Sequence, residues 1–130
     1  MTKIFLLVFL GSITSSAQNS SSVQAPSVVY SMEKIDYGNI YHKSYGIRTI
    51  KISNIGSAPL VVTSCISSCG CTRPSCPTTP ILPGTYSQIS VYYDTKKIGP
   101  IDKNITITTN DPKRPTITIP LTGNVLLRKE

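Results

Sequence analysis

The sequence predicts an all-β protein that folds as an antiparallel β-sandwich of about seven strands. From Val28 onward, short runs of β-branched and aromatic residues are separated by Gly, Pro, Asn and Asp. These breaks recur at intervals of roughly 8–12 residues, which is typical of a sandwich or barrel. No stretch keeps a helical periodicity over three turns, so no helix is expected.

Several runs alternate polar and apolar residues with period two, and this alternation predicts which side chains face the core. In the run from Thr116 to Leu121 the isoleucines are expected to point inward and the threonines outward. The residues predicted to be buried in this way are Ile50, Ile52, Ile89, Val91, Tyr93, Ile105, Ile107, Ile117, Ile119 and Leu121. Because each strand has one polar face, antiparallel pairing is expected.

Turn-forming residues predict where the strands end. Pro83-Gly84 offers the fixed φ and the positive φ of a type II turn. The segment 110–113, Asn-Asp-Pro-Lys, separates 105–109 from 116–120, so these two strands are expected to form a hairpin. Pro120 cannot donate a ladder hydrogen bond, which places its strand at a sheet edge or at a bulge.

Residues 1–17 have the layout of a secretory signal peptide. Lys3 precedes an apolar run over 4–10, and small residues then lead to Ala17, after which cleavage is expected. The run is shorter than the roughly 20 residues that span a membrane, and the first Cys, Cys65, is too distant to carry a lipid anchor. We therefore expect a secreted or periplasmic protein with no transmembrane segment in the mature chain.

The mature chain divides into two parts. Residues 18–27 are rich in Ser, Asn and Gln and are expected to form a flexible leader. Residues 28–130 are expected to form one domain, which is long enough to bury a core. Without Lys3, twelve basic residues stand against six acidic ones, but they are dispersed along the sequence. Since nucleic-acid binding proteins concentrate their basic residues in a patch or stripe, no nucleic-acid partner is expected.

Six short motifs occur in the order seen in a bacterial protein family. They are Asp36-Tyr37-Gly38-Asn39-Ile40, 49–56, Ser68-Cys69-Gly70-Cys71-Thr72, 80–84, Tyr93-Asp94-Thr95 and 121–125. On these motifs the chain resembles the domain-of-unknown-function family fifteen seventy-three, which is akin to the ASH/HYDIN-type immunoglobulin-like domains. The resemblance implies an immunoglobulin-like β-sandwich in an exported protein, and it implies no catalytic activity. Cys69 and Cys71 match the family motif, whereas Cys65 and Cys76 are additions.

The four cysteines are the main candidate site, with the spacing C-x3-C-x-C-x4-C from Cys65 to Cys76 in a Pro-rich segment interpreted as an irregular loop. An even number of Cys in an exported domain favours disulfides, and the favoured pairs are Cys65 with Cys76 and Cys69 with Cys71. A bond across Gly70 alone is feasible, but so small a ring should be strained and easier to reduce. Cys69 and Cys71 are therefore expected to be the more reactive pair.

Two other uses of the cluster stay open. The four thiolates could bind a soft metal, Zn²⁺ or Cu⁺, although the usual C-x2-C spacing of a zinc knuckle is absent. Cys69 and Cys71 could instead exchange disulfides, although the C-x-x-C motif of thioredoxin-like enzymes is also absent. Structural disulfides without a metal or cofactor are the main prediction, and periplasmic thiol-redox or metal handling is the alternative.

No residues suggest catalysis. His42 is the single histidine, and no neighbouring Ser or Cys motif suggests a triad. Asp36, Asp94, Asp102 and Asp111 stand beside residues typical of turns, where hydrogen bonds to the backbone explain them. We therefore expect a non-enzymatic binding or structural module of the bacterial envelope, whose partner is a protein or an envelope polymer.

Overall fold

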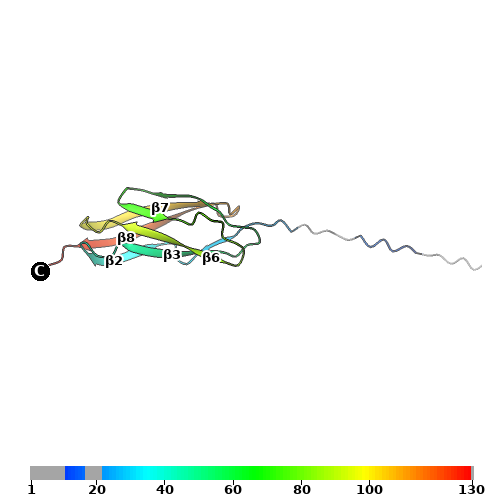
Figure 1. Ribbon diagram of the computed structural model, residues 1–130, viewed down its shortest axis with the longest axis horizontal. Helices are drawn as coiled ribbons and strands as arrows, with labels where there is room; N and C mark the ends of the chain where they lie inside the picture. Colours follow the sequence, from blue (N-terminus) through cyan, green and yellow to red (C-terminus); the bar gives the residue numbers. More distant parts are fainter. Residues whose placement is uncertain (1–10, 17–21, 130) are drawn as a thin grey trace, which may run out of the picture.

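The computed structural model describes residues 11–16 and 22–129, which form two facing β-sheets and an N-terminal extension (Figure 1). The strands are β1 (Val28–Tyr30), β2 (Ile35–Tyr41), β3 (Ile47–Asn54), β4 (Val62–Ser67), β5 (Thr72–Ser75), β6 (Tyr86–Tyr93), β7 (Gly99–Thr109) and β8 (Thr116–Leu126). The first sheet has the order β1-β3-β6-β5 and the second the order β2-β8-β7-β4. The predicted all-β sandwich is confirmed, with eight strands rather than about seven.

The predicted signal peptide, residues 1–17, lies largely outside the described residues, so it stays a prediction. Within the part of the chain that the structure describes, no helix has the length and apolar character needed to cross a bilayer.

The hairpin predicted around the Asn-Asp-Pro-Lys turn is formed by β7 and β8. Ile105 pairs with Ile119 across the hairpin, and both are fully buried, as is Ile107. On the opposite face Thr118 is exposed and Thr106 partly exposed. The inward and outward faces of this hairpin are therefore those that the alternation predicted.

The core lies between the two sheets and contains all ten residues that the alternation predicted to be buried. Nine further residues complete it: Val28, Tyr30, Ile35, Tyr37, Leu60, Cys71, Ile81, Ile101 and Val125. Several of these lie in short strands or loops, where too few residues alternate for a period to be recognised.

One strand pairing differs from the prediction. β2 runs parallel to β8, whereas the other strand pairs are antiparallel. A parallel pair requires a long crossover, and nearly the whole domain, from β3 to β7, lies between these two strands. The alternation in β2 could not reveal this, because an edge strand with one polar face looks the same in either direction.

Pro120 lies in a strand that is interior to its sheet, which the sequence did not predict. The expectation of an edge position holds only locally. Pairing of β8 with β2 begins at Leu121, opposite Ile35, so Pro120 itself faces only Asn104 of β7. A residue without an N–H group is tolerated there because no strand flanks the second side of β8 at that point.

Asn54 joins several loops at the end where the chain enters the sandwich. Its side chain is 1% exposed, and its Nδ2 donates to the carbonyl oxygens of Ala58 and Ile81, at 2.8 and 2.9 Å. Its Oδ1 accepts from the N–H groups of Ser27 and Gly56, at 3.3 and 2.9 Å. One amide thus satisfies four backbone groups of segments that lack regular pairing.

Asp111 connects the two sheets at the same end. Its carboxylate is 3% exposed and accepts the N–H groups of Val28, at the start of β1, and of Lys113 and Arg114 in the β7–β8 turn. Burial alone raises the pKa of this carboxyl, but the three backbone donors and the Lys113 charge outweigh burial and lower its pKa below the ordinary value. The turn-forming role predicted for Asp111 is present.

The leader contacts the sandwich earlier in the sequence than expected. Ala25 exchanges hydrogen bonds with Ser57, and the carbonyl of Ser27 accepts the N–H of Ile55, at 2.9 Å. A Cβ atom on Gly56 would lie 2.4 Å from the carbonyl oxygen of Ala25, so this close approach requires glycine. The chain is therefore fixed to the sandwich from Ala25 rather than from residue 28.

Candidate functional site

The four cysteines lie in or next to two edge strands and not in a single irregular loop, which corrects the interpretation of this segment. Cys65 lies within β4, at the edge of the second sheet, and Cys76 directly follows β5, at the edge of the first. Cys69 and Cys71 lie in the connection between the two strands. The sequence did not reveal β5 because Pro74 stands in its centre, and proline is tolerated in strands mainly at sheet edges.

The Cys65–Cys76 disulfide joins the two sheets. The structure forms this favoured pair with Cα atoms 6.5 Å apart, and both residues pack partly buried against the core. Because β4 and β5 belong to different sheets, the bond crosses from one layer of the sandwich to the other. Closing a loop of about a dozen residues restricts the unfolded chain and contributes on the order of 3 kcal/mol.

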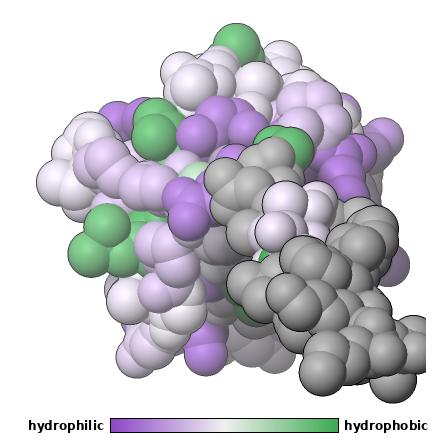
Figure 2. All heavy atoms as spheres, turned by 90° about the vertical axis from the view of Figure 1, so that its right-hand side faces the viewer, coloured by the Kyte–Doolittle hydropathy of each residue, from purple (hydrophilic) through white to green (hydrophobic). Residues whose placement is uncertain are grey.

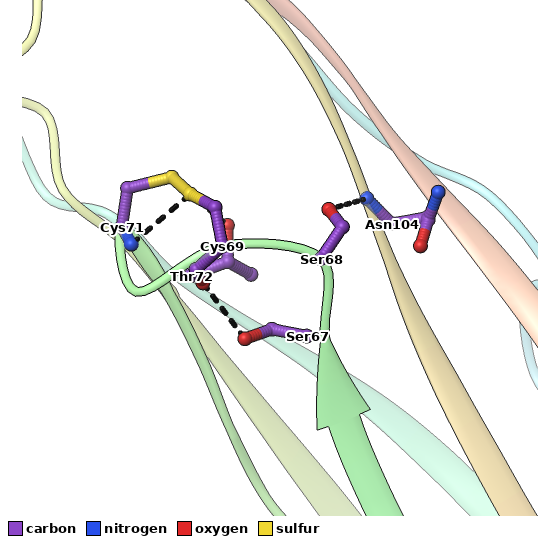
Figure 3. Close-up of a disulfide and its surroundings, with 6 residues drawn as sticks. All are labelled: Ser67, Ser68, Cys69, Cys71, Thr72 and Asn104. Carbon is purple, nitrogen blue, oxygen red and sulfur yellow. Dashed lines mark hydrogen bonds between the residues drawn. A yellow bond between two sulfur atoms is a disulfide. The ribbon is translucent and has the colours of Figure 1, made fainter.

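The second disulfide closes a ring across Gly70 (Figure 3). The Cα atoms of Cys69 and Cys71 are 5.4 Å apart, and the N–H of Cys71 is directed at the Sγ of Cys69, at 3.1 Å. Cys71 is 6% exposed and belongs to the core, whereas Cys69 is partly exposed. A reagent in solution therefore reaches the Cys69 side of this bond first.

The connection that carries this disulfide is bound to both sheets. On one side the Ser68 Oγ accepts the N–H of Asn104 in β7, at 3.1 Å (Figure 3). The Ser68 N–H in turn donates to the Asn104 carbonyl, at 2.9 Å. On the other side the N–H of Asp94, just after β6, donates to the Cys71 carbonyl at 2.9 Å. These contacts join residues far apart in the sequence, so no local pattern could predict them.

The pairing of the four sulfur atoms bears on the metal alternative. All are in disulfides, so the structure presents no thiolate for Zn²⁺ or Cu⁺. Across residues 11–16 and 22–129, no three His, Cys, Asp or Glu side chains come together as a metal site would require. Soft-metal handling by this cluster would therefore require prior reduction of its disulfides.

The remaining residues considered from sequence have local roles. The Asp94 carboxylate, directly after β6, accepts the N–H of Lys96 two positions later, as predicted for turns. The Asp36 carboxylate accepts the Gly38 N–H in the same way, but Asp36 lies within β2, where the pairing with β8 shifts register. Asp102 is an exception, since it is exposed within β7 and pairs with Thr122 rather than lying in a turn. His42 directly follows β2, and its backbone N–H donates to the Leu126 carbonyl at 2.8 Å.

The outer face of the first sheet is a second candidate surface, which sequence reasoning missed. The Arg73 guanidinium lies 4.8 Å from the centre of the Tyr92 ring, and the Lys51 ammonium lies 4.3 Å from the centre of the Tyr86 ring. An open hollow of about 350 Å³ is lined by Ile47, Arg73, Pro74, Ser75, Ser90 and Tyr92. These residues come from three strands and become neighbours only through the register of β3, β6 and β5.

Two facing sheets of this topology define an immunoglobulin-like β-sandwich domain. The chain belongs to the family described as protein of unknown function (DUF1573), whose model matches residues 28–125. This match confirms the resemblance inferred from the six motifs and covers most of the sandwich. No curated protein shows detectable similarity to the chain.

Solved structures confirm the fold. A protein of unknown function from Porphyromonas gingivalis W83 has a TM-score of 0.70 at 20% identity, over 84% of this chain and 51% of that one, so this chain spans about half of its length. The ASH/PapD-like domain of human CEP192 has a TM-score of 0.62 at 11% identity, over 91% and 98% of the two chains. The periplasmic chaperone SfaE has a TM-score of 0.54 at 8% identity, over 80% and 61%.

A mild reductant is expected to open Cys69–Cys71 before Cys65–Cys76. A ring closed across one residue is more strained than one closed across ten, and strained disulfides reduce more readily; the partial exposure of Cys69 adds access. Stepwise reduction, alkylation and peptide mass mapping measure the order, and untreated exported protein should have a mass four hydrogens below the reduced value. Labelling of Cys65 and Cys76 at the lower reductant concentration would contradict the expected order.

Proposed function

We propose that this chain is an exported, non-enzymatic module of the bacterial envelope that binds a protein or an envelope polymer through the outer face of its first sheet. The observation that carries the proposal is the pair of cation–tyrosine contacts on that face, Arg73 with Tyr92 and Lys51 with Tyr86. Arg and Tyr are enriched in binding surfaces because they combine apolar contact area with polar groups. The two disulfides support export to an oxidising compartment.

The charge of this face indicates the kind of partner. Strands β3, β5 and β6 contain no acidic residue, so Lys51 and Arg73 are not neutralised by a carboxylate on the same three strands. Between Tyr86 and Tyr92, the outward-facing side chains of β6 are an amide at Gln88 and a hydroxyl at Ser90. Such a face favours a partner that presents acidic groups or a neutral polar surface.

The inter-sheet disulfide supports this surface mechanically. β5 has a single partner strand, β6, and it carries Arg73 and Ser75 at the rim of the hollow. The Cys65–Cys76 bond attaches the end of β5 to β4 of the other sheet. A short edge strand fixed in this way presents its side chains in one arrangement, which lowers the entropic cost of binding.

Photo-crosslinking in cells tests the proposal. A benzophenone-bearing amino acid at Ser75, at the rim of the hollow, should yield a discrete crosslinked product. The same amino acid at Thr118, exposed on the outer face of the other sheet, is the matched control and should yield none. Arg73→Glu should weaken the interaction by about tenfold or more, as loss of an interface anchor does. Equal crosslinking from both positions, or a product that is insensitive to Arg73→Glu, would contradict the proposal.

A second candidate function is thiol–disulfide exchange by Cys69 and Cys71. The partial exposure of Cys69 and the one-residue ring favour it. In such a step a substrate dithiol would be oxidised to a disulfide while Cys69–Cys71 is reduced to two thiols. One equivalent of the protein should then oxidise one equivalent of a reduced model dithiol peptide, and the Cys69→Ala/Cys71→Ala variant should oxidise none. A variant that oxidises the peptide as well as the parent protein would exclude this function.

A further inference from the structure

Three segments that are distant in sequence meet at the end of the sandwich opposite the leader (Figure 1). They are 41–46 at the end of β2, 94–98 after β6 and 126–129 at the end of β8. Hydrogen bonds join them, from Lys43 N–H to the Thr95 carbonyl, from Thr95 Oγ1 to the Ser44 carbonyl and from His42 N–H to the Leu126 carbonyl. We call this surface, formed by the three segments, the basic end.

The basic end gathers cations that the sequence shows dispersed. Its exposed basic side chains are Lys43, Lys96, Lys97, Arg128 and Lys129, with His42 partly exposed beside them. Among the described residues of the three segments only Asp94 is acidic, and its carboxylate already accepts the Lys96 N–H, at 3.0 Å. Among the described residues, five exposed cations thus face a single carboxylate, which leaves this surface with a net positive charge.

The opposite end of the sandwich provides an internal comparison. There the Arg114 guanidinium forms a salt bridge with Glu33, and Lys113 stands near the buried carboxylate of Asp111. Figure 2 shows that end, where hydrophobic residues form separate patches among hydrophilic ones. Exposed apolar groups thus occur at both ends, but among the described residues the excess of basic over acidic side chains distinguishes the basic end.

Apolar side chains stand between the cations of the basic end. Tyr45 is 72% exposed, Ile98 55% and Leu127 64%, and the Arg128 guanidinium lies 5.5 Å from the centre of the Tyr41 ring. Two adjoining hollows of about 420 Å³ each share Leu127 and Arg128 in their walls. Interleaved basic, aromatic and aliphatic groups are the composition of surfaces that bind the interface of an anionic membrane.

We propose that the basic end binds the surface of an anionic lipid bilayer. The lysines and Arg128 contact headgroup phosphates, while Tyr45, Ile98 and Leu127 enter the boundary between headgroups and acyl chains. The apolar residues favour a bilayer over a dissolved polyanion, because a polyanion would use the cations and leave these side chains in water. This inference goes beyond the proposed function and uses another surface, so the outer face of the first sheet stays free for its partner.

Co-sedimentation with lipid vesicles tests the inference on protein purified after export. Vesicles of phosphatidylcholine with one third phosphatidylglycerol should bind the protein, pure phosphatidylcholine vesicles should not, and binding should weaken with salt. Each cation near an anionic surface contributes about a fivefold factor in affinity. Lys96→Glu/Lys97→Glu should therefore weaken binding by about 25-fold or more. The control Lys34→Glu/Lys51→Glu changes the net charge equally, away from the basic end, and should weaken it only a few-fold.

The apolar residues separate a lipid surface from a polyanion site. Ile98→Ser/Leu127→Ser should reduce vesicle binding several-fold while binding to heparin, a dissolved polyanion, stays unchanged. Circular dichroism and thermal melting verify that each variant is folded. Three results would overturn the inference: no binding to anionic vesicles, equal losses in the two charge-reversal variants, or vesicle binding that is indifferent to Ile98→Ser/Leu127→Ser.

Discussion

Replacing Ile119 by alanine is expected to lower the free energy of unfolding by about 2–5 kcal/mol. Ile119 is fully buried between the sheets, opposite Ile105 of the neighbouring strand. Truncation removes apolar contacts from both layers and leaves a cavity that the paired strands cannot close without losing their hydrogen bonds. Chemical denaturation followed by circular dichroism measures the change.

Thr118→Ala is the matched control for this experiment. Thr118 precedes Ile119 on the same strand but points outward and is exposed, so its replacement should alter the free energy of unfolding by no more than about 0.5 kcal/mol. In a strand, a shift of one residue exchanges the two faces. A larger loss for Thr118→Ala than for Ile119→Ala would therefore show that the register of β8 is displaced by one residue.

Asn54→Asp is expected to be comparably damaging although it changes few atoms. The substitution replaces the Nδ2 donor by a carboxylate oxygen that faces the carbonyls of Ala58 and Ile81. The Ile81 carbonyl still accepts the Leu60 N–H, so the main cost is a buried charge that faces two carbonyl oxygens. An uncompensated buried charge costs about 3–5 kcal/mol, and a loss of about that size is expected. Urea denaturation near neutral pH measures it. Part of the loss relative to the parent protein should be recovered in acid, where a protonated carboxyl can donate again.

Asn110→Asp controls for the chemistry of this substitution. The Asn110 amide likewise donates from Nδ2 to a carbonyl, that of Pro59 at 3.1 Å, and accepts the Val61 N–H at 2.8 Å. Asn110 is exposed, so water can satisfy the groups that it releases and the loss should be about 1 kcal/mol or less. Equal losses at the two positions would mean that burial of the Asn54 amide is not what makes it important.

The two disulfides show how far the sequence could specify the candidate site. Spacing and export favoured the pairs Cys65–Cys76 and Cys69–Cys71, and the structure has these pairs. The interpretation of this segment as an irregular loop was wrong, because Cys71 belongs to the core and β5 is a strand of the first sheet. Pro74 concealed that strand in the sequence, because proline argues against a central strand and is tolerated mainly in edge strands.

Local patterns were sufficient for the longer alternating strands and their buried faces, whereas the candidate binding surfaces depend on long-range strand pairing. The alternation in β8, for example, follows from the two-residue period of a strand over a core, so Ile117 and Ile119 could be placed from their neighbours alone. Other features depend on which distant strands become neighbours. They are the parallel pairing of β2 with β8, the pairing of Tyr92 with Arg73 across β6 and β5, and the hydrogen bond from Lys43 to Thr95. The neighbours of each strand are determined by the burial of both sheets against a common core. This burial involves the whole chain, so it cannot be read from a short stretch of sequence.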